Sequence, residues 1–199
     1  MMKRLIGIGL FVFFAASCEE QSSGNSTSKI KQGVQFHKPQ KFNESKETEN
    51  VVKLLAVGSE LVFDNKLLEQ SKEQNKPLLL YFTGFSCVNC RKIEQMTLND
   101  DIVFNLLNDD FIFLPLYVDN RTELAKSDQV YSSTLRRTMT TIGDKNMVYE
   151  IEEYNASSQP LFVCLNSKGE IIGTTDYAKS SKYPFEDFLR DCLKKVNNK

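Results

Sequence analysis

The chain of 199 residues has almost no histidine, no excess of one charge and no long apolar run beyond its first residues. Its single histidine, His37, lies in a polar stretch, so multi-imidazole metal sites and Ser–His or Cys–His catalysis are poorly supported. A formal net charge of −1 supplies no basic field for nucleic acid. After residue 18 no segment approaches the roughly 20 apolar residues of a membrane helix. What is left is one ordinary globular domain with appendages.

The N-terminal residues are typical of an export signal. Two basic residues precede an apolar stretch over 5–16, which is too short to span a bilayer comfortably. The stretch ends Ala-Ala-Ser directly before Cys18, which resembles the lipobox of bacterial lipoproteins, where the cysteine carries lipid and becomes the mature N-terminus. We therefore expect a lipoprotein signal peptide over 1–17 and lipidation of Cys18. An ordinary signal peptide, or an uncleaved anchor with an incidental cysteine, is the alternative.

The segment that follows is polar. Residues 18–50 are rich in Ser, Asn, Gln, Lys and Glu, and they bury too little apolar surface to offset chain entropy. We expect a flexible tether there and a folded domain over 51–199. The expected location is the cell envelope, with the chain lipid-anchored and facing the periplasm or the outer-membrane surface. Cysteines in such a compartment meet oxidising conditions.

A Cys-x-x-Cys motif, Cys87-Val88-Asn89-Cys90, carries the chemistry. It follows a short apolar run over 78–83 and precedes a helical pattern that extends to about residue 98. A strand that turns into a helix puts Cys87 at the helix N-terminus, where free backbone N–H groups and the helix dipole favour a thiolate. Cys90, one turn further in, can attack a mixed disulfide formed by Cys87. These two thiols are the minimal machinery for thiol–disulfide exchange.

The rest of the pattern alternates helices and strands. We expect a short first strand over 51–57, helices over 61–73, from 100, over 144–154 and from 184, and strands over 78–83, 111–118, 161–165 and 170–175. The stretch over 119–159 is less regular and is interpreted as an insertion. One hypothesis is that the loops of this insertion help to select the partner protein.

This order of elements is that of the thioredoxin fold. The run over 82–92, Phe-Thr-Gly-Phe-Ser-Cys-Val-Asn-Cys-Arg-Lys, resembles thioredoxin-like proteins related to the C-terminal domain of the thiol–disulfide interchange protein DsbD. The runs over 116–119 and 141–145 resemble the same group, especially its Bacteroidetes members. The resemblance extends from about residue 61 to the C-terminus. It implies an α/β thioredoxin-like fold, with a central mixed β-sheet flanked by helices and an insertion before the cis-proline strand.

The resemblance also implies residue roles. Cys87 is the exposed nucleophile, Cys90 the resolving thiol, and Pro160 a cis-proline whose preceding backbone pairs with a substrate peptide. Glu94 matches an acidic position that raises the cysteine pKa and assists proton transfer. A strand-initiating trans Pro160 and a solvated Glu94 are the alternatives. No metal and no cofactor are expected beyond the redox-active Cys87–Cys90 disulfide.

Two departures from the group are visible. Tyr81 stands where a buried Asp usually relays protons to the resolving thiol, which leaves Glu94 or water for that task. The chain also has no membrane domain of its own, so a separate membrane thiol-electron donor is expected, with the lipid tether raising the encounter rate. Cys164 and Cys192 are interpreted as small apolar core residues, and a second redox pair is the alternative.

The pattern therefore favours a membrane-anchored extracytoplasmic thiol–disulfide oxidoreductase, a protein-disulfide reductase or electron relay acting on protein thiols and disulfides. The reducing direction comes from the resemblance alone. Two other functions stay open. One is a copper- or metal-handling protein that uses the two motif cysteines as soft ligands. The other is a non-catalytic binding lipoprotein.

Overall fold

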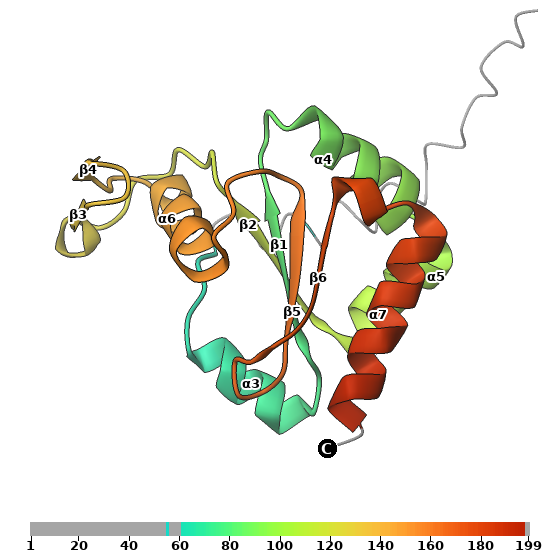
Figure 1. Cartoon of the computed structure of the whole chain (residues 1–199). Helices are drawn as coiled ribbons and strands as arrows, with labels where there is room; N and C mark the ends of the chain where they lie inside the picture. The colour runs from blue at the N-terminus through green and yellow to red at the C-terminus, as the bar shows by residue number, and fades with distance from the viewer. Residues whose placement is uncertain (1–54, 56–60, 198–199) are drawn as a thin grey trace, which may run out of the picture. The chain divides into compact units, whose positions relative to one another are not determined.

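The computed structural model describes residue 55 and residues 61–197 (Figure 1). The expected signal peptide, Cys18 and the tether lie outside the described residues. So does the expected first strand over 51–57, apart from Leu55, which is buried and helical rather than extended. Within the described part of the chain, no helix has the length and apolar character needed to cross a membrane.

A four-stranded mixed sheet forms the centre, in the order β2-β1-β5-β6. Strand β1 (Leu78–Thr83) pairs in parallel with β2 (Ile112–Tyr117) and antiparallel with β5 (Leu161–Leu165), which pairs antiparallel with β6 (Ile171–Asp176). Every residue of β1 is buried, as expected for a central strand covered on both faces. The predicted α/β thioredoxin-like fold is confirmed.

Helices cover both faces of this sheet. On one face lie α4 (Val88–Ile93) with its π-helical continuation η1 (Glu94–Leu98), α5 (Asp101–Asp110) and α7 (Lys182–Asn197) (Figure 1). On the other lie α3 (Lys66–Gln74) and α6 (Ile142–Tyr154). The period of two along β1 divides the core between the faces, with Leu79 and Tyr81 on the first and Leu78, Leu80 and Phe82 on the second.

Some element boundaries agree with the prediction from the sequence, and others differ by a few residues. The strands over 78–83 and 161–165 have the predicted bounds. Helix α3 begins only at Lys66, later than expected, and ends at Gln74, and the next residue, Asn75, has the left-handed conformation. Helix α7 begins two residues before Pro184. This proline lies in the first helical turn, where the missing N–H has no intrahelical partner to lose.

The insertion is more ordered than the sequence indicated. It contains a small hairpin, β3 (Tyr131–Ser132) with β4 (Arg137–Thr138), and then α6, which starts two residues earlier than predicted. A capping box begins α6, because Thr141 accepts from the Asp144 N–H and Asp144 accepts from the Thr141 N–H. At Gly143 a Cβ would lie 2.7 Å from the backbone of Asn120, so glycine lets α6 approach the chain that leaves β2.

Candidate active site

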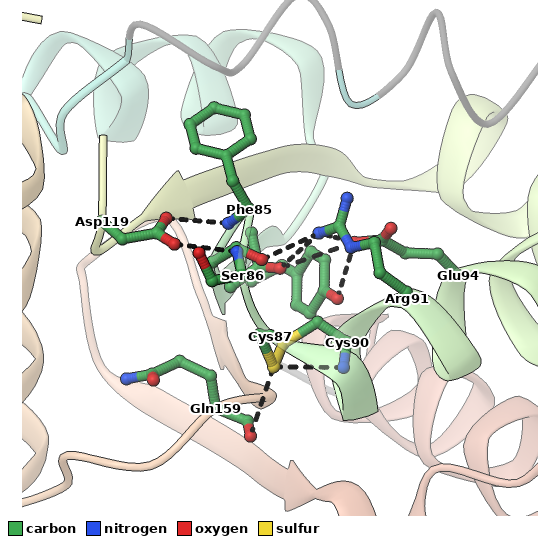
Figure 2. Close-up of polar contacts among 11 residues, drawn as sticks. Phe85, Ser86, Cys87, Cys90, Arg91, Glu94, Asp119 and Gln159 are labelled. Atoms are coloured by element: carbon green, nitrogen blue, oxygen red, sulfur yellow. Dashed lines mark hydrogen bonds and ion pairs between the residues drawn. A yellow bond between two sulfur atoms is a disulfide. The ribbon is translucent and has the colours of Figure 1, made fainter. Parts of the chain in front are cut away.

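The two motif cysteines lie at the carboxyl end of β1, where the chain turns into α4 (Figure 2). Cys87 is the N-cap of α4, and its sulfur accepts from the Cys90 N–H at 3.1 Å. The two sulfurs form a disulfide with an S–S distance of 2.08 Å. Cys87 is partly exposed whereas Cys90 is buried. A partner can therefore reach the first sulfur, and the second is shielded.

Asp119 holds the loop that presents Cys87. Its two carboxylate oxygens accept from the N–H groups of Phe85 and Ser86, at 2.8 and 2.9 Å (Figure 2). A Cβ at Gly84 would lie 3.2 Å from the same carboxylate, so glycine permits this close approach. In the sequence, Asp119 stands out only as the last residue of a run that resembles the DsbD-related group, and its role in holding the loop was not predicted. Its place just beyond β2, the strand beside β1, is the signal that could have found it.

The expected cis-proline is present. The Gln159–Pro160 peptide bond is cis, and the Gln159 carbonyl oxygen lies 3.7 Å from the Cys87 sulfur (Figure 2). Pro160 is buried and Gln159 is half-buried. Two segments 72 residues apart thus meet at the reactive sulfur, and a backbone acceptor faces it.

Glu94 is buried on the same helix as the cysteines, with an exposed fraction of 6%. Its Oε1 accepts from Arg91 at 2.7 Å, from the Tyr81 hydroxyl at 3.0 Å and from the Thr83 hydroxyl at 3.4 Å. The alternative of a solvated helix carboxylate is therefore wrong. Burial raises the pKa of Glu94, and Arg91 and the two hydroxyl donors oppose the rise.

Tyr81, the residue that replaces the usual aspartate, takes part in this cluster. It is fully buried, its ring stacks on Phe162 with centroids 4.4 Å apart, and its hydroxyl donates to Glu94. Burial, followed by the neighbouring Glu94 charge, raises the pKa of Tyr81, so the phenol stays a neutral donor. A carboxylate thus lies next to the side chain at position 81, and a different element, η1, supplies it.

Glu150 of α6 was missed by the sequence analysis. Its side chain is fully buried, and its Oε2 accepts from the Gln159 side-chain amide at 2.6 Å. Burial raises the pKa of Glu150 to about 7, and the hydrogen bond from Gln159 opposes the rise. Helical spacing could have found it, because Glu150 stands between Met147 and Tyr154 on the face that packs on the sheet.

The remaining described cysteines lie in the core. Cys164 of β5 and Cys192 of α7 are both buried and free, as the interpretation as small apolar residues required. A hydrogen bond with Cys192, followed by burial, raises the pKa of Cys164, so this thiol is a poor nucleophile. Among the described cysteines, Cys87–Cys90 is the one disulfide.

No group of three or more His, Cys, Asp or Glu side chains gathers into a metal-binding arrangement within residues 61–197. Cys87 and Cys90 are joined to each other in a disulfide, so neither offers a free thiolate to a metal ion in this state. The metal-handling alternative therefore gains no support from this part of the chain.

A family model described as thioredoxin-like matches residues 63–142. No curated protein matches the chain. Among solved structures, the chain is similar to a DsbH oxidoreductase at 17% identity and a TM-score of 0.49, covering 64% of this chain and 78% of that one.

Two further structures are similar over comparable lengths. A thioredoxin from Thermus thermophilus is 19% identical, with a TM-score of 0.47 and coverage of 66% of this chain and 84% of that one. The oxidised DsbD C-terminal domain of Neisseria meningitidis is 15% identical, with a TM-score of 0.40 and coverage of 63% and 85%. The family-model match, the sheet order and the cis-proline beside the Cys-x-x-Cys pair confirm the resemblance to thioredoxin-like proteins.

Proposed function

We propose that this chain is a membrane-anchored extracytoplasmic protein-disulfide reductase or electron relay. The observation that supports it most strongly is the Cys87–Cys90 disulfide, with one sulfur reachable and one shielded, beside the cis Gln159–Pro160 bond. A thioredoxin-like fold with this pair supports thiol–disulfide exchange as the general chemistry. The reducing direction and the membrane location are the finer parts of the proposal.

The exchange runs in two steps. In the reduced protein the Cys87 thiolate attacks one sulfur of a partner's disulfide, a mixed disulfide forms, and the partner's other sulfur leaves as a thiolate. The deprotonated Cys90 then attacks the Cys87 sulfur, which releases the partner's second thiol and restores the Cys87–Cys90 disulfide. Two electrons pass to the partner. A membrane thiol donor returns them by the same exchange in reverse.

The surrounding residues fit this sequence of steps. The Cys90 N–H, donating to the Cys87 sulfur, stabilises negative charge there. Asp119 holds the loop in place, and the Gln159 carbonyl accepts from an extended substrate chain. We assign proton exchange with Cys90 to Glu94, a buried carboxylate of raised pKa on the same helix.

Anchoring is proposed from the sequence alone. Lipid on Cys18 and a polar tether would hold the domain beside a membrane thiol donor and raise the effective concentration of the pair. Replacing Cys18 by serine is expected to move the protein from the membrane fraction to the soluble fraction and to abolish labelling by a radioactive fatty acid. Unchanged fractionation and labelling would contradict the anchor.

Insulin reduction with dithiothreitol as electron source tests the activity. We expect turnover by the wild type and background rates for Cys87→Ser, with Cys164→Ser as the matched control that keeps activity. Activity that survives Cys87→Ser would overturn the enzymatic proposal. Equilibration with glutathione tests the direction, since a potential near about −120 mV, that of a strong oxidant, would contradict a reductase.

A further inference from the structure

Gln159 has two contacts that point in different directions. Its backbone carbonyl oxygen lies 3.7 Å from the Cys87 sulfur, while its side-chain amide donates to Glu150 Oε2 at 2.6 Å. In Figure 2 the Gln159 side chain extends away from the cysteine pair while its carbonyl group lies toward it. Glu150 therefore holds the side chain of Gln159, whose backbone carbonyl faces the reactive sulfur.

We propose that Glu150 is a positioning residue for peptide substrates, which fixes Gln159 so that its backbone carbonyl stays presented beside Cys87. This inference rests on the proposed thiol–disulfide exchange, because it assigns a residue of the same site. Glu150 does not touch the reacting sulfurs. It acts through Gln159.

The burial of Glu150 has no other explanation in the described part of the chain. Its exposed fraction is zero, and its second carboxylate oxygen, Oε1, has no hydrogen-bond partner. A buried carboxyl group with one oxygen unpaired is costly, and an apolar side chain of similar volume would suit the core of α6 better. The one interaction that it gains is the bond to Gln159.

Pro160 fixes the other side of this carbonyl group. Pro160 is buried at the start of β5, so the carbonyl before it is fixed on one side by the strand. The Gln159 side chain is only half-buried, and it rotates freely unless it is bonded. Without the Glu150–Gln159 bond the residue is free to reorient, and its carbonyl is presented beside Cys87 for less of the time.

The substrate class follows from what this carbonyl accepts. A protein or peptide disulfide brings backbone N–H groups to the sulfur that it presents, and these donate to the Gln159 carbonyl as in strand addition. A small disulfide without amides, such as hydroxyethyl disulfide, reacts at Cys87 without that bond. Peptide disulfides therefore depend on the Glu150–Gln159 pair, and small disulfides do not.

The experiment compares kcat/KM for insulin and for hydroxyethyl disulfide in Glu150→Leu, Glu150→Gln and Gln159→Ala. Glu150→Leu and Gln159→Ala are each expected to lose about fivefold on insulin, the effect of one ordinary hydrogen bond, mainly in KM. Their rates on the small disulfide are expected to stay within about twofold of wild type, below the effect of one bond. Glu150→Gln keeps an acceptor oxygen and is expected to restore the insulin rate. Glu153→Leu, an exposed glutamate of the same helix, is the control.

Three results would overturn the inference: an equal loss on both disulfides, no loss on either, or independent losses that add in the Glu150→Leu/Gln159→Ala double variant. If Glu150→Leu fails to fold, Gln159→Ala decides, because its side chain is half-buried and its removal leaves the core intact. Cys87→Ser, run on both disulfides, separates the two proposals. Residual turnover there contradicts the exchange chemistry, whereas an inert Cys87→Ser with unaffected Glu150 variants contradicts only the positioning role.

Discussion

Two buried carboxyl groups lie on opposite faces of the sheet, and they are supported very differently. Glu94, on the face of α4, receives hydrogen bonds from Arg91, Tyr81 and Thr83. Glu150, on the face of α6, receives one, from Gln159, and its other oxygen is unpaired. Burial raises the pKa of both groups, and the three donors around Glu94 and the single donor at Glu150 oppose the rise. Glu94 thus has three donors, one of them charged, to offset the cost of its burial, and Glu150 has one neutral donor.

Removing each carboxyl group in turn tests this contrast, and it is expected to give the largest change in stability. Glu94→Leu leaves the Arg91 guanidinium and the Tyr81 hydroxyl without their acceptor. The cost is expected to be about 3 kcal/mol of unfolding free energy, at the low end for a broken buried pair because the Arg91 side chain is 38% exposed. Glu150→Leu leaves only the neutral Gln159 amide without its acceptor. Its free energy of unfolding is therefore expected to stay within about 1 kcal/mol of wild type. Urea unfolding at pH 7 measures both.

The exposed Glu153→Leu is the matched control for these two variants and is expected to change stability by less than about 0.5 kcal/mol. Equal losses of unfolding free energy in Glu94→Leu and Glu150→Leu would show that the three donors around Glu94 stabilise the fold no more than the single donor at Glu150. The contrast drawn between the two sites would then be wrong.

A second, smaller effect depends on pH. The folded-state pKa of Glu150 is about 7 against an ordinary value of 4.5, so the folded protein binds more protons than the unfolded chain between these values. The contribution of Glu150 to stability is therefore fully present below pH 4.5 and is lost as pH rises through about 7, by about 2.5 kcal/mol between pH 5 and pH 8. Glu150→Gln cannot ionise and is expected to remove this part of the dependence. The difference in unfolding free energy between Glu150→Gln and wild type, measured at pH 5 and at pH 8, gives the contribution of Glu150 alone. A constant difference between the two pH values would contradict the assignment.

The smallest effect comes from a third carboxylate of the site, which is not buried. Asp119 is half-exposed and bonds the N–H groups of Phe85 and Ser86. Because water can replace it, Asp119→Ala is expected to cost only about 1 kcal/mol. The two amides should nevertheless exchange hydrogen faster, which NMR hydrogen exchange detects residue by residue. Asp119→Asn, which keeps one acceptor oxygen, should leave one amide as protected as in wild type and speed the exchange of the other. Unchanged exchange in both variants would show that Asp119 does not hold the loop.

The parts of the site predicted from sequence are those that local chemistry marks. The apolar run over 78–83 and the Cys-x-x-Cys spacing gave the strand, the turn and the N-cap position of Cys87. Gln159-Pro160 before an apolar run gave the cis-proline strand once the fold was inferred. Each signal lies within a few residues of the structure that it predicts.

The parts that could not be predicted depend on contacts between distant segments. Whether Glu94 is solvated or buried depends on Tyr81, 13 residues away on β1, whose hydroxyl reaches it across the strand–helix packing. The role of Glu150 requires the register of α6 against the chain before β5. The β3–β4 hairpin has strands of two residues each, too short for an alternating pattern. Helical spacing can place Glu150 on the buried face of α6, but composition and spacing do not show which distant residues these side chains meet.

One measurement tests the central claim, that exchange proceeds through Cys87 with Cys90 as the resolving thiol. Cys90→Ala and Cys87→Ala, each reduced and mixed with a peptide disulfide, are quenched with acid and analysed by intact mass and peptide mapping. The account predicts a stable mixed disulfide on Cys87 in the first variant and no adduct in the second. Adduct on Cys90, or equal adduct in both variants, would contradict it.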